Sequence, residues 1–195
     1  MGCFLRTRGA RALRGRHAFF AAAALLGIVV GGALGCSGKD PAPVVLAPYV
    51  AFESDFQDFH SWESFAITMD IAPGNDHLNG PRHLFLNKRP PPGSQEFPVG
   101  TIMVKESDGD DATARHVFAM VKRGADFNVG GALNWEWFEL ANTSGGSVVI
   151  KWRGFGPTNG DAYGGDATGG CNACHKTAAA SDYVFTGPTT AMIGK

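Results

Sequence analysis

Two cysteines and a histidine near the end of the chain have the spacing of a haem attachment site. Cys171, Cys174 and His175 form a C-x-x-C-H sequence that is followed by only twenty residues. This spacing is the signature of a c-type haem, because two thiols one helical turn apart can each add to a vinyl group of one porphyrin. The adjacent His175 then reaches the iron as the proximal ligand. The sequence therefore predicts a cytochrome with one covalent haem c per chain.

A zinc half-site or a redox-active dithiol would use the same two cysteines. Zinc would require further Cys or His ligands at suitable spacing, and the sequence contains no second pair of this kind. A thioredoxin-like dithiol would be expected in a βαβ context, whereas residues 164–170 before the motif are rich in glycine. Haem attachment is the favoured interpretation.

The first 35 residues have the build of a bacterial secretory signal. Five arginines within residues 6–16 precede an apolar, Ala- and Gly-rich stretch at residues 19–34. The stretch ends in Ala-Leu-Gly-Cys36, which resembles a lipoprotein processing box, so we expect Cys36 to become the lipidated N-terminus and residues 36–48 to form a short tether. The alternative is an uncleaved anchor helix. In both cases the haem domain, residues 49–195, is expected on the periplasmic side of a bacterial membrane, and the lipoprotein is expected at the outer membrane.

Charge and cysteine usage narrow the classes of protein further. The whole chain has 17 Lys and Arg against 18 Asp and Glu; the signal holds five of the bases and none of the acids, which leaves the mature chain with a formal charge of −6. An acidic domain without a basic tract is a poor candidate for nucleic-acid binding. Cys3 leaves with the signal, Cys36 carries lipid and the motif cysteines carry haem, so no disulfide is expected. About 150 residues remain, enough for one compact domain.

The body of the chain predicts an α+β fold that is mainly an antiparallel sheet. Ser54-Asp55 can cap a short helix through Phe56, Phe59 and Trp62-Glu63. Alternating patterns bounded by turn residues then indicate up to six strands, at residues 63–71, 83–87, 101–106, 113–122, 134–141 and 148–153. Residues 143–146 predict a hairpin loop and 154–170 a long Gly-rich loop. Residues 175–180 predict the short helix that carries the haem ligand.

Several blocks of this sequence resemble the cytochrome P-460 family, which includes the beta-type cytochromes c prime. The matching blocks are residues 96–106 (Glu-Phe-Pro-Val-Gly-Thr-Ile-Met-Val-Lys-Glu), 134–135, 171–176 and 182–185. The likeness covers most of residues 50–186, although residues 148–170 form a longer stretch than in the founding members. The resemblance implies a mostly antiparallel β fold, a homodimer and a five-coordinate haem whose distal side is open.

Lys105 occupies the position that hydroxylamine-oxidising members of this family join covalently to the porphyrin. Independently of the resemblance, strand alternation puts Ile102 and Val104 on one face and Thr101, Met103 and Lys105 on the other. A methionine and a lysine on one face suit the edge of a haem. The alternative is a solvated lysine on an exposed strand face.

Oxidation of a bound nitrogen compound also requires a base that takes up its protons. Alignment to the family through Phe118 and Gly124 puts Asp126 at the place of the distal acid. Glu136 and Glu139 are alternatives, because they lie in a strand dense with Trp and Phe. Each of the three could instead be an ordinary surface acid.

Two classes of function follow from these residues. In the first, the haem iron oxidises hydroxylamine or a related small nitrogen compound, and the electrons pass to a periplasmic acceptor cytochrome. In the second, the protein is not catalytic and binds nitric oxide or another gas. A His or Met as sixth iron ligand would instead make it an electron-transfer cytochrome. The Lys105 cross-link and a distal base separate the first class from the second, because the fold alone does not fix an activity.

Overall fold

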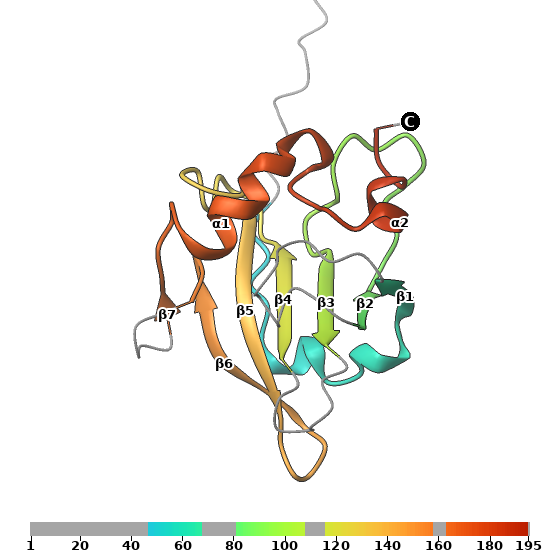
Figure 1. The fold of residues 1–195 in the computed structure, drawn as a ribbon, viewed down its shortest axis with the longest axis vertical. Coiled ribbons are helices and arrows are strands. Elements are labelled where there is room, and N and C mark those ends of the chain that lie inside the picture. Colours follow the sequence, from blue (N-terminus) through green and yellow to red (C-terminus); the bar gives the residue numbers. More distant parts are fainter. Residues whose placement is uncertain (1–46, 68–80, 108–115, 158–162, 195) are drawn as a thin grey trace, which may run out of the picture. The chain divides into compact units, whose positions relative to one another are not determined.

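The chain folds around one extended sheet. The computed structural model describes residues 47–67, 81–107, 116–157 and 163–194, all of which belong to one compact unit, residues 43–195. Seven strands follow in chain order from one edge of the sheet to the other (Figure 1). The first six pair antiparallel, and the seventh pairs with the sixth in parallel. An α+β fold with a mainly antiparallel sheet is therefore confirmed.

The observed strands follow the predicted ones closely. They are β1 (Glu63–Ile67), β2 (Arg82–Leu86), β3 (Ile102–Ser107), β4 (Val117–Lys122), β5 (Trp135–Asn142), β6 (Val148–Gly154) and β7 (Tyr163–Gly164). The bounds of β2, β3, β5 and β6 agree with the alternation pattern within one residue. Residues 68–71 and 113–115, predicted as parts of the first and fourth strands, lie outside the described residues. The hairpin between β5 and β6 lies where predicted, and the Thr143 backbone N–H donates to the Ser147 carbonyl at 2.8 Å.

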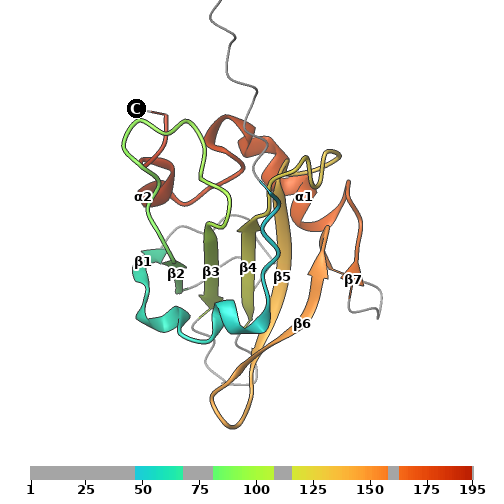
Figure 2. The ribbon, with the colours of Figure 1, turned by 180° about the vertical axis from the view of Figure 1, so that it is seen from behind.

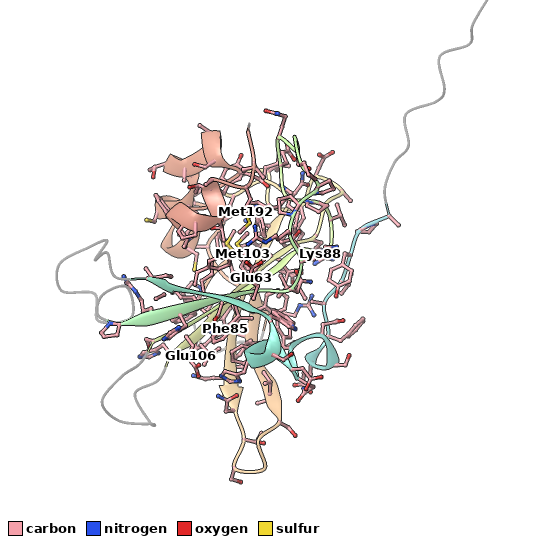
Figure 3. The ribbon with its side chains drawn as sticks, turned by 90° about the vertical axis from the view of Figure 1, so that its right-hand side faces the viewer. Glu63, Phe85, Lys88, Met103, Glu106 and Met192 are labelled. Atoms are coloured by element: carbon pink, nitrogen blue, oxygen red, sulfur yellow. The ribbon has the colours of Figure 1, made fainter. Side chains whose placement is uncertain are left out.

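Each face of the sheet carries its own hydrophobic cluster, because successive strand side chains point to opposite sides. One face packs against two short helices, η1 (Glu53–Phe56) and η2 (Phe59–Ser61), through Phe85, Val104 and Phe138. The other, which we call the cysteine face, packs against the C-terminal segment that includes Cys171. In Figure 3, Met103 and Met192 lie on the side of the C-terminal segment, and Phe85 and Glu106 on the side of η1 and η2.

The N-terminal helix differs in form from the prediction. Instead of one helix through Phe56, Phe59 and Trp62, the chain forms the two 3₁₀ turns η1 and η2, and β1 begins at Glu63. Asp58 between them has φ −109° and ψ 24°, which interrupts the helix. Phe56 is the last residue of η1 and Phe59 the first of η2, and both rings are fully buried in the core.

The Gly-rich stretch before the cysteine motif also differs from the prediction of a loop, because it contains β7. Its pairing with β6 depends on glycine: a Cβ on Gly154 would lie 2.5 Å from the Gly164 carbonyl oxygen. The Phe155 backbone N–H donates to that same oxygen at 2.6 Å. Residues 158–162 of this stretch lie outside the described residues.

The C-terminal segment consists of α1 (Gly170–His175), η4 (Lys176–Ser181) and α2 (Gly187–Thr190). It crosses one end of the sheet, at the top in Figures 1 and 2. The helix predicted at residues 175–180 is present as η4, but His175 is the last residue of α1. Among the residues described, no helix is long and apolar enough to span a membrane.

Candidate functional site

A single row of side chains crosses six strands on the cysteine face. The register places Lys105 opposite Leu84 on β2 and Phe118 on β4. From β1 to β6 the row is Phe65, Leu84, Lys105, Phe118, Glu139 and Trp152. Its charged members, Lys105 and Glu139, are two strand spacings apart, about 10 Å. The predicted face for Lys105, shared with Met103 and opposite to Val104, is confirmed.

Lys105 is half-buried on the face of the sheet that packs against the cysteine motif. Burial and, after it, the charge of Arg82 together lower the pKa of its ammonium from 10.5 to about 8. Arg82 is itself only 1% exposed and shares the face of Leu84, two residues along β2. Cys171 and Cys174 act in the opposite direction and raise the pKa of Lys105 by charge interaction. Lys105 is thus partly covered rather than fully exposed on its strand.

The His175 ring is held in one orientation. Its Nδ1 lies 2.6 Å from the carbonyl oxygen of Tyr183, and since a carbonyl only accepts, Nδ1 carries the proton and Nε2 keeps its lone pair. Trp137 and Phe185 pack on the ring with centroid distances of 4.5 and 5.1 Å. Burial lowers the pKa of His175 to about 4, so the imidazole is neutral at physiological pH, the form that ligates a metal.

Cys171 and Cys174 are free, half-buried thiols on one turn of α1. Burial raises the pKa of Cys171 to about 11, against the opposing effect of Lys105. A redox-active dithiol needs a thiol of lowered pKa, so this environment disfavours that alternative. Within the described parts of the chain, no three His, Cys, Asp or Glu side chains group together as metal ligands.

Asn172, inside the motif, anchors α1 to the sheet. Its side chain is buried, and its Oδ1 accepts hydrogen bonds from Asn128 Nδ2 (2.8 Å), the Ala132 backbone N–H (3.1 Å) and Trp137 Nε1 (2.8 Å). Its Nδ2 donates to the Phe155 carbonyl at 2.7 Å. A Cβ on Gly131 would lie 2.2 Å from Asn172 Cγ, so glycine is required where the two meet.

A buried ion pair fixes the chain just after the motif. Lys122 Nζ lies 2.5 Å from Asp182 Oδ1, and each side chain is only 3% exposed. The Phe97 backbone N–H donates to Asp182 Oδ2 at 2.9 Å. Burial raises the pKa of Asp182, although the hydrogen bond from Lys122 opposes this shift. Asp182 thus joins the block at residues 96–106 to the block at residues 182–185.

The three candidate acids occupy different places. Asp126 is exposed in the turn that follows β4. Glu136 points away from the cysteine face and is fully buried between Arg153 (Nε to Oε1, 2.8 Å) and Arg123 (Nη1 to Oε2, 3.1 Å), so it stabilises the fold. Glu139 is the candidate acid in the row of Lys105, and its carboxylate contacts Lys151 and accepts from Trp152 Nε1 at 2.6 Å.

Histidine and methionine side chains, the residue types that could supply a sixth iron ligand, lie on both faces of the sheet. His60 lies with its Nε2 3.0 Å from Glu106 Oε2 and packs on Phe59, on the face away from the cysteines. Met103 and Met120 are buried neighbours on the cysteine face. Cys36, the predicted lipidation site, lies outside the described residues.

The residues on the cysteine face fit a c-type haem. They provide two thiols on one helical turn, an imidazole with a free Nε2, an apolar cluster and two cations, Lys105 and Arg82, that complement an anionic porphyrin edge. Arg82, Asn172 and the Lys122–Asp182 pair are parts of this arrangement that the sequence analysis did not identify.

The class that fold and site define is an α+β domain with a C-x-x-C-H motif packed on one face of an antiparallel sheet. No protein family, curated protein or solved structure matches the chain.

Proposed function

We propose that this protein is a mono-haem c-type cytochrome of the cytochrome P-460 type that oxidises hydroxylamine or a related small nitrogen compound. The observation that carries the proposal is the position of Lys105, which stands between Leu84 and Phe118 on the face of the sheet that packs against Cys171. A haem attached to Cys171 and Cys174 would have this lysine near its edge. Near its pKa of about 8, a fraction of this amine is neutral.

Each residue then has a chemical role. When bound, haem c supplies an iron that binds the substrate nitrogen and takes up its electrons. Cys171 and Cys174 would hold the porphyrin, and His175 would present Nε2 to the iron while the Tyr183 carbonyl fixes its ring. Lys105 would lie at the porphyrin edge and tune its electronic properties.

Glu139 is a better-placed proton acceptor than Asp126. It shares the row of Lys105 on the cysteine face, whereas Asp126 is exposed in a turn. A base must come within hydrogen-bond reach of the proton that it removes, directly or through one water. We keep Asp126 as the acid that the family resemblance assigns and test both.

Gas binding without catalysis is the second candidate, and one observation favours it. Both carboxylate oxygens of Glu139 are engaged, Oε1 by Lys151 and Oε2 by Trp152. A carboxylate held in this way gives up an interaction when it takes a proton. A protein without a free base would bind nitric oxide or another gas at the open iron.

We also propose a location and partners for the protein. Lipid on Cys36 would hold a homodimer at the periplasmic side of the outer membrane, where an acceptor cytochrome receives the electrons. The basic, apolar N-terminus and the excess acid of the mature chain support export and make nucleic acid an improbable partner.

Spectra and turnover of the isolated haem protein test the function. The wild type should show a red-shifted Soret band and hydroxylamine oxidation with an added acceptor cytochrome, and Lys105→Leu should lose both. Lys88→Leu, which removes an exposed lysine, is the matched control and should change neither. A normal c-type spectrum with carbon monoxide binding and no turnover would favour the gas-binding protein.

The same assay identifies the base. Glu139→Gln should abolish turnover with an unchanged spectrum if Glu139 takes up the protons, and Asp126→Asn should do so if the family alignment is right. Loss of turnover in neither variant would contradict a carboxylate base on this part of the chain.

A further inference from the structure

We propose that the buried Lys122–Asp182 pair positions the proximal histidine, by fixing the Tyr183 carbonyl that accepts the His175 Nδ1–H. The inference rests on the proposed function, in which His175 binds haem iron. Among the described residues, the His175 ring is hydrogen-bonded to the Tyr183 carbonyl and not to Lys122 or Asp182, so this pair would act on the ring only as positioning residues.

Asp182 is held in place by hydrogen bonds to several parts of the fold. Its two carboxylate oxygens accept from different parts of the fold, Oδ1 from Lys122 on β4 and Oδ2 from the Phe97 backbone N–H. Its main-chain carbonyl accepts from Trp135 Nε1 at 3.0 Å, on β5. Side chain and backbone of this one residue are thus tied to two strands and to the segment before β3.

The backbone at this point has an unusual conformation. Asp182 and Tyr183 have φ of 50° and 65°, two consecutive non-glycine residues in the left-handed region. Such residues are strained and persist only where the surroundings hold them. The anchoring of Asp182 provides this hold, together with the Tyr183 backbone N–H, which donates to the Ala178 carbonyl at 2.9 Å.

This conformation brings the Tyr183 carbonyl to the His175 ring. The left-handed pair turns the chain back over the end of η4, and the Tyr183 carbonyl oxygen comes to lie 2.6 Å from His175 Nδ1. A hydrogen bond from Nδ1 raises the basicity of Nε2 and fixes the ring plane. The strength of the iron–histidine bond, and with it the reduction potential, therefore depends on a charge pair on β4 and the chain after η4.

Variants of the pair in the haem-loaded protein test this inference. Asp182→Asn weakens the anchor and leaves the buried Lys122 ammonium with only the exposed Glu96 carboxylate as counter-charge, whereas Asp182→Asn with Lys122→Met removes the buried charge and should recover stability. We expect both variants to shift the ferrous iron–histidine stretching band in resonance Raman spectra to lower frequency and to raise the reduction potential. Glu96→Gln, at the exposed group 3.5 Å from Lys122, is the control and should leave both unchanged.

Two outcomes overturn the inference. In one, the single and double variants keep the wild-type stretching band and potential. In the other, the double variant recovers the band together with stability, which would make the pair purely structural. A chain that carries no covalent haem would refute the proposed function instead. NMR of the His175 ring nitrogens then decides the positioning: the Nδ1–H tautomer should dominate in the wild type and be lost in Asp182→Asn, and an unchanged tautomer would overturn it.

Discussion

Lys105 and Cys171 share one face of the sheet, where burial raises the pKa of the thiol to about 11 and lowers that of the ammonium to about 8, and the charge of each residue partly opposes the shift of the other. The two residues come from β3 and α1, far apart in the sequence. Their proximity links the Lys-containing block at residues 96–106 to the haem attachment motif, the two features on which the family resemblance mainly rests.

The buried amine of Lys105 predicts a pH dependence of stability in the haem-free chain. Its pKa is about 8 when folded and 10.5 in the ordinary reference state. Below pH about 8 the amine is protonated in both the folded and the unfolded state, so burial of its charge lowers the free energy of unfolding by the full amount. Between these values the unfolded chain binds more protons than the folded one, so the free energy of unfolding should rise with pH.

Urea denaturation of the wild type and Lys105→Met measures this effect, because all other titrating groups are shared. The wild type should gain stability relative to the variant as pH rises through that window. If the free energies of unfolding of the two proteins changed with pH in parallel, folding would not lower the pKa of Lys105.

Asn172 should be essential to the stability of the motif. Asn172→Ala leaves three donors, on Asn128, Ala132 and Trp137, without their acceptor. Each unpaired buried group costs about 1–3 kcal/mol. Gly131→Ala should destabilise the fold too, because the new Cβ would overlap Asn172. Chemical denaturation measures both, with the exposed Val129→Ala as control; an unchanged midpoint in Asn172→Ala would contradict the anchor.

Glu136 and Glu139, on opposite faces of β5, should respond differently to the same substitution. Glu136→Gln leaves Arg123 and Arg153 without their buried counter-charge and should cost about 3 kcal/mol of unfolding free energy. Glu139→Gln removes a pair with the half-exposed Lys151 and should cost about 1 kcal/mol or less. Thermal denaturation compares them, and equal losses would argue against this division of roles.

The strands and the face of Lys105 could be predicted because alternation is a local signal that the sheet preserves. The same alternation separates Glu136 from Glu139. Glu139 shares the cysteine face with Trp135 and Trp137, whereas Glu136 lies on the opposite face with Phe138. β7 could not be predicted, because its two residues pair through a glycine contact that leaves no periodic pattern.

The polar anchors could not be found from spacing. Lys122 and Asp182 are distant in sequence, and each alone is typical of a surface residue; their burial depends on the packing of the C-terminal segment against β4. Asn172 occupies a position of the motif that haem chemistry leaves open, and its role depends on donors from β5 and the turn before it.

The N-terminal signal predicts that Cys36→Ser releases the protein from the membrane. Without the thiol no lipid can be attached, so the protein should move from the membrane fraction to the soluble fraction. Fractionation with mass spectrometry of the mature N-terminus measures this. Ser37→Ala, next to the processing site, is the control and should stay membrane-bound. An unmodified Cys36 in membrane-extracted wild type would contradict the lipid anchor.

Peptide mass spectrometry of the protein purified from an exporting host tests the haem site most directly. We expect one haem on the peptide that contains Cys171 and Cys174, with the Lys105 peptide joined to the same porphyrin. Haem-free thiols at both cysteines, in a host that matures other c-type cytochromes, would contradict it.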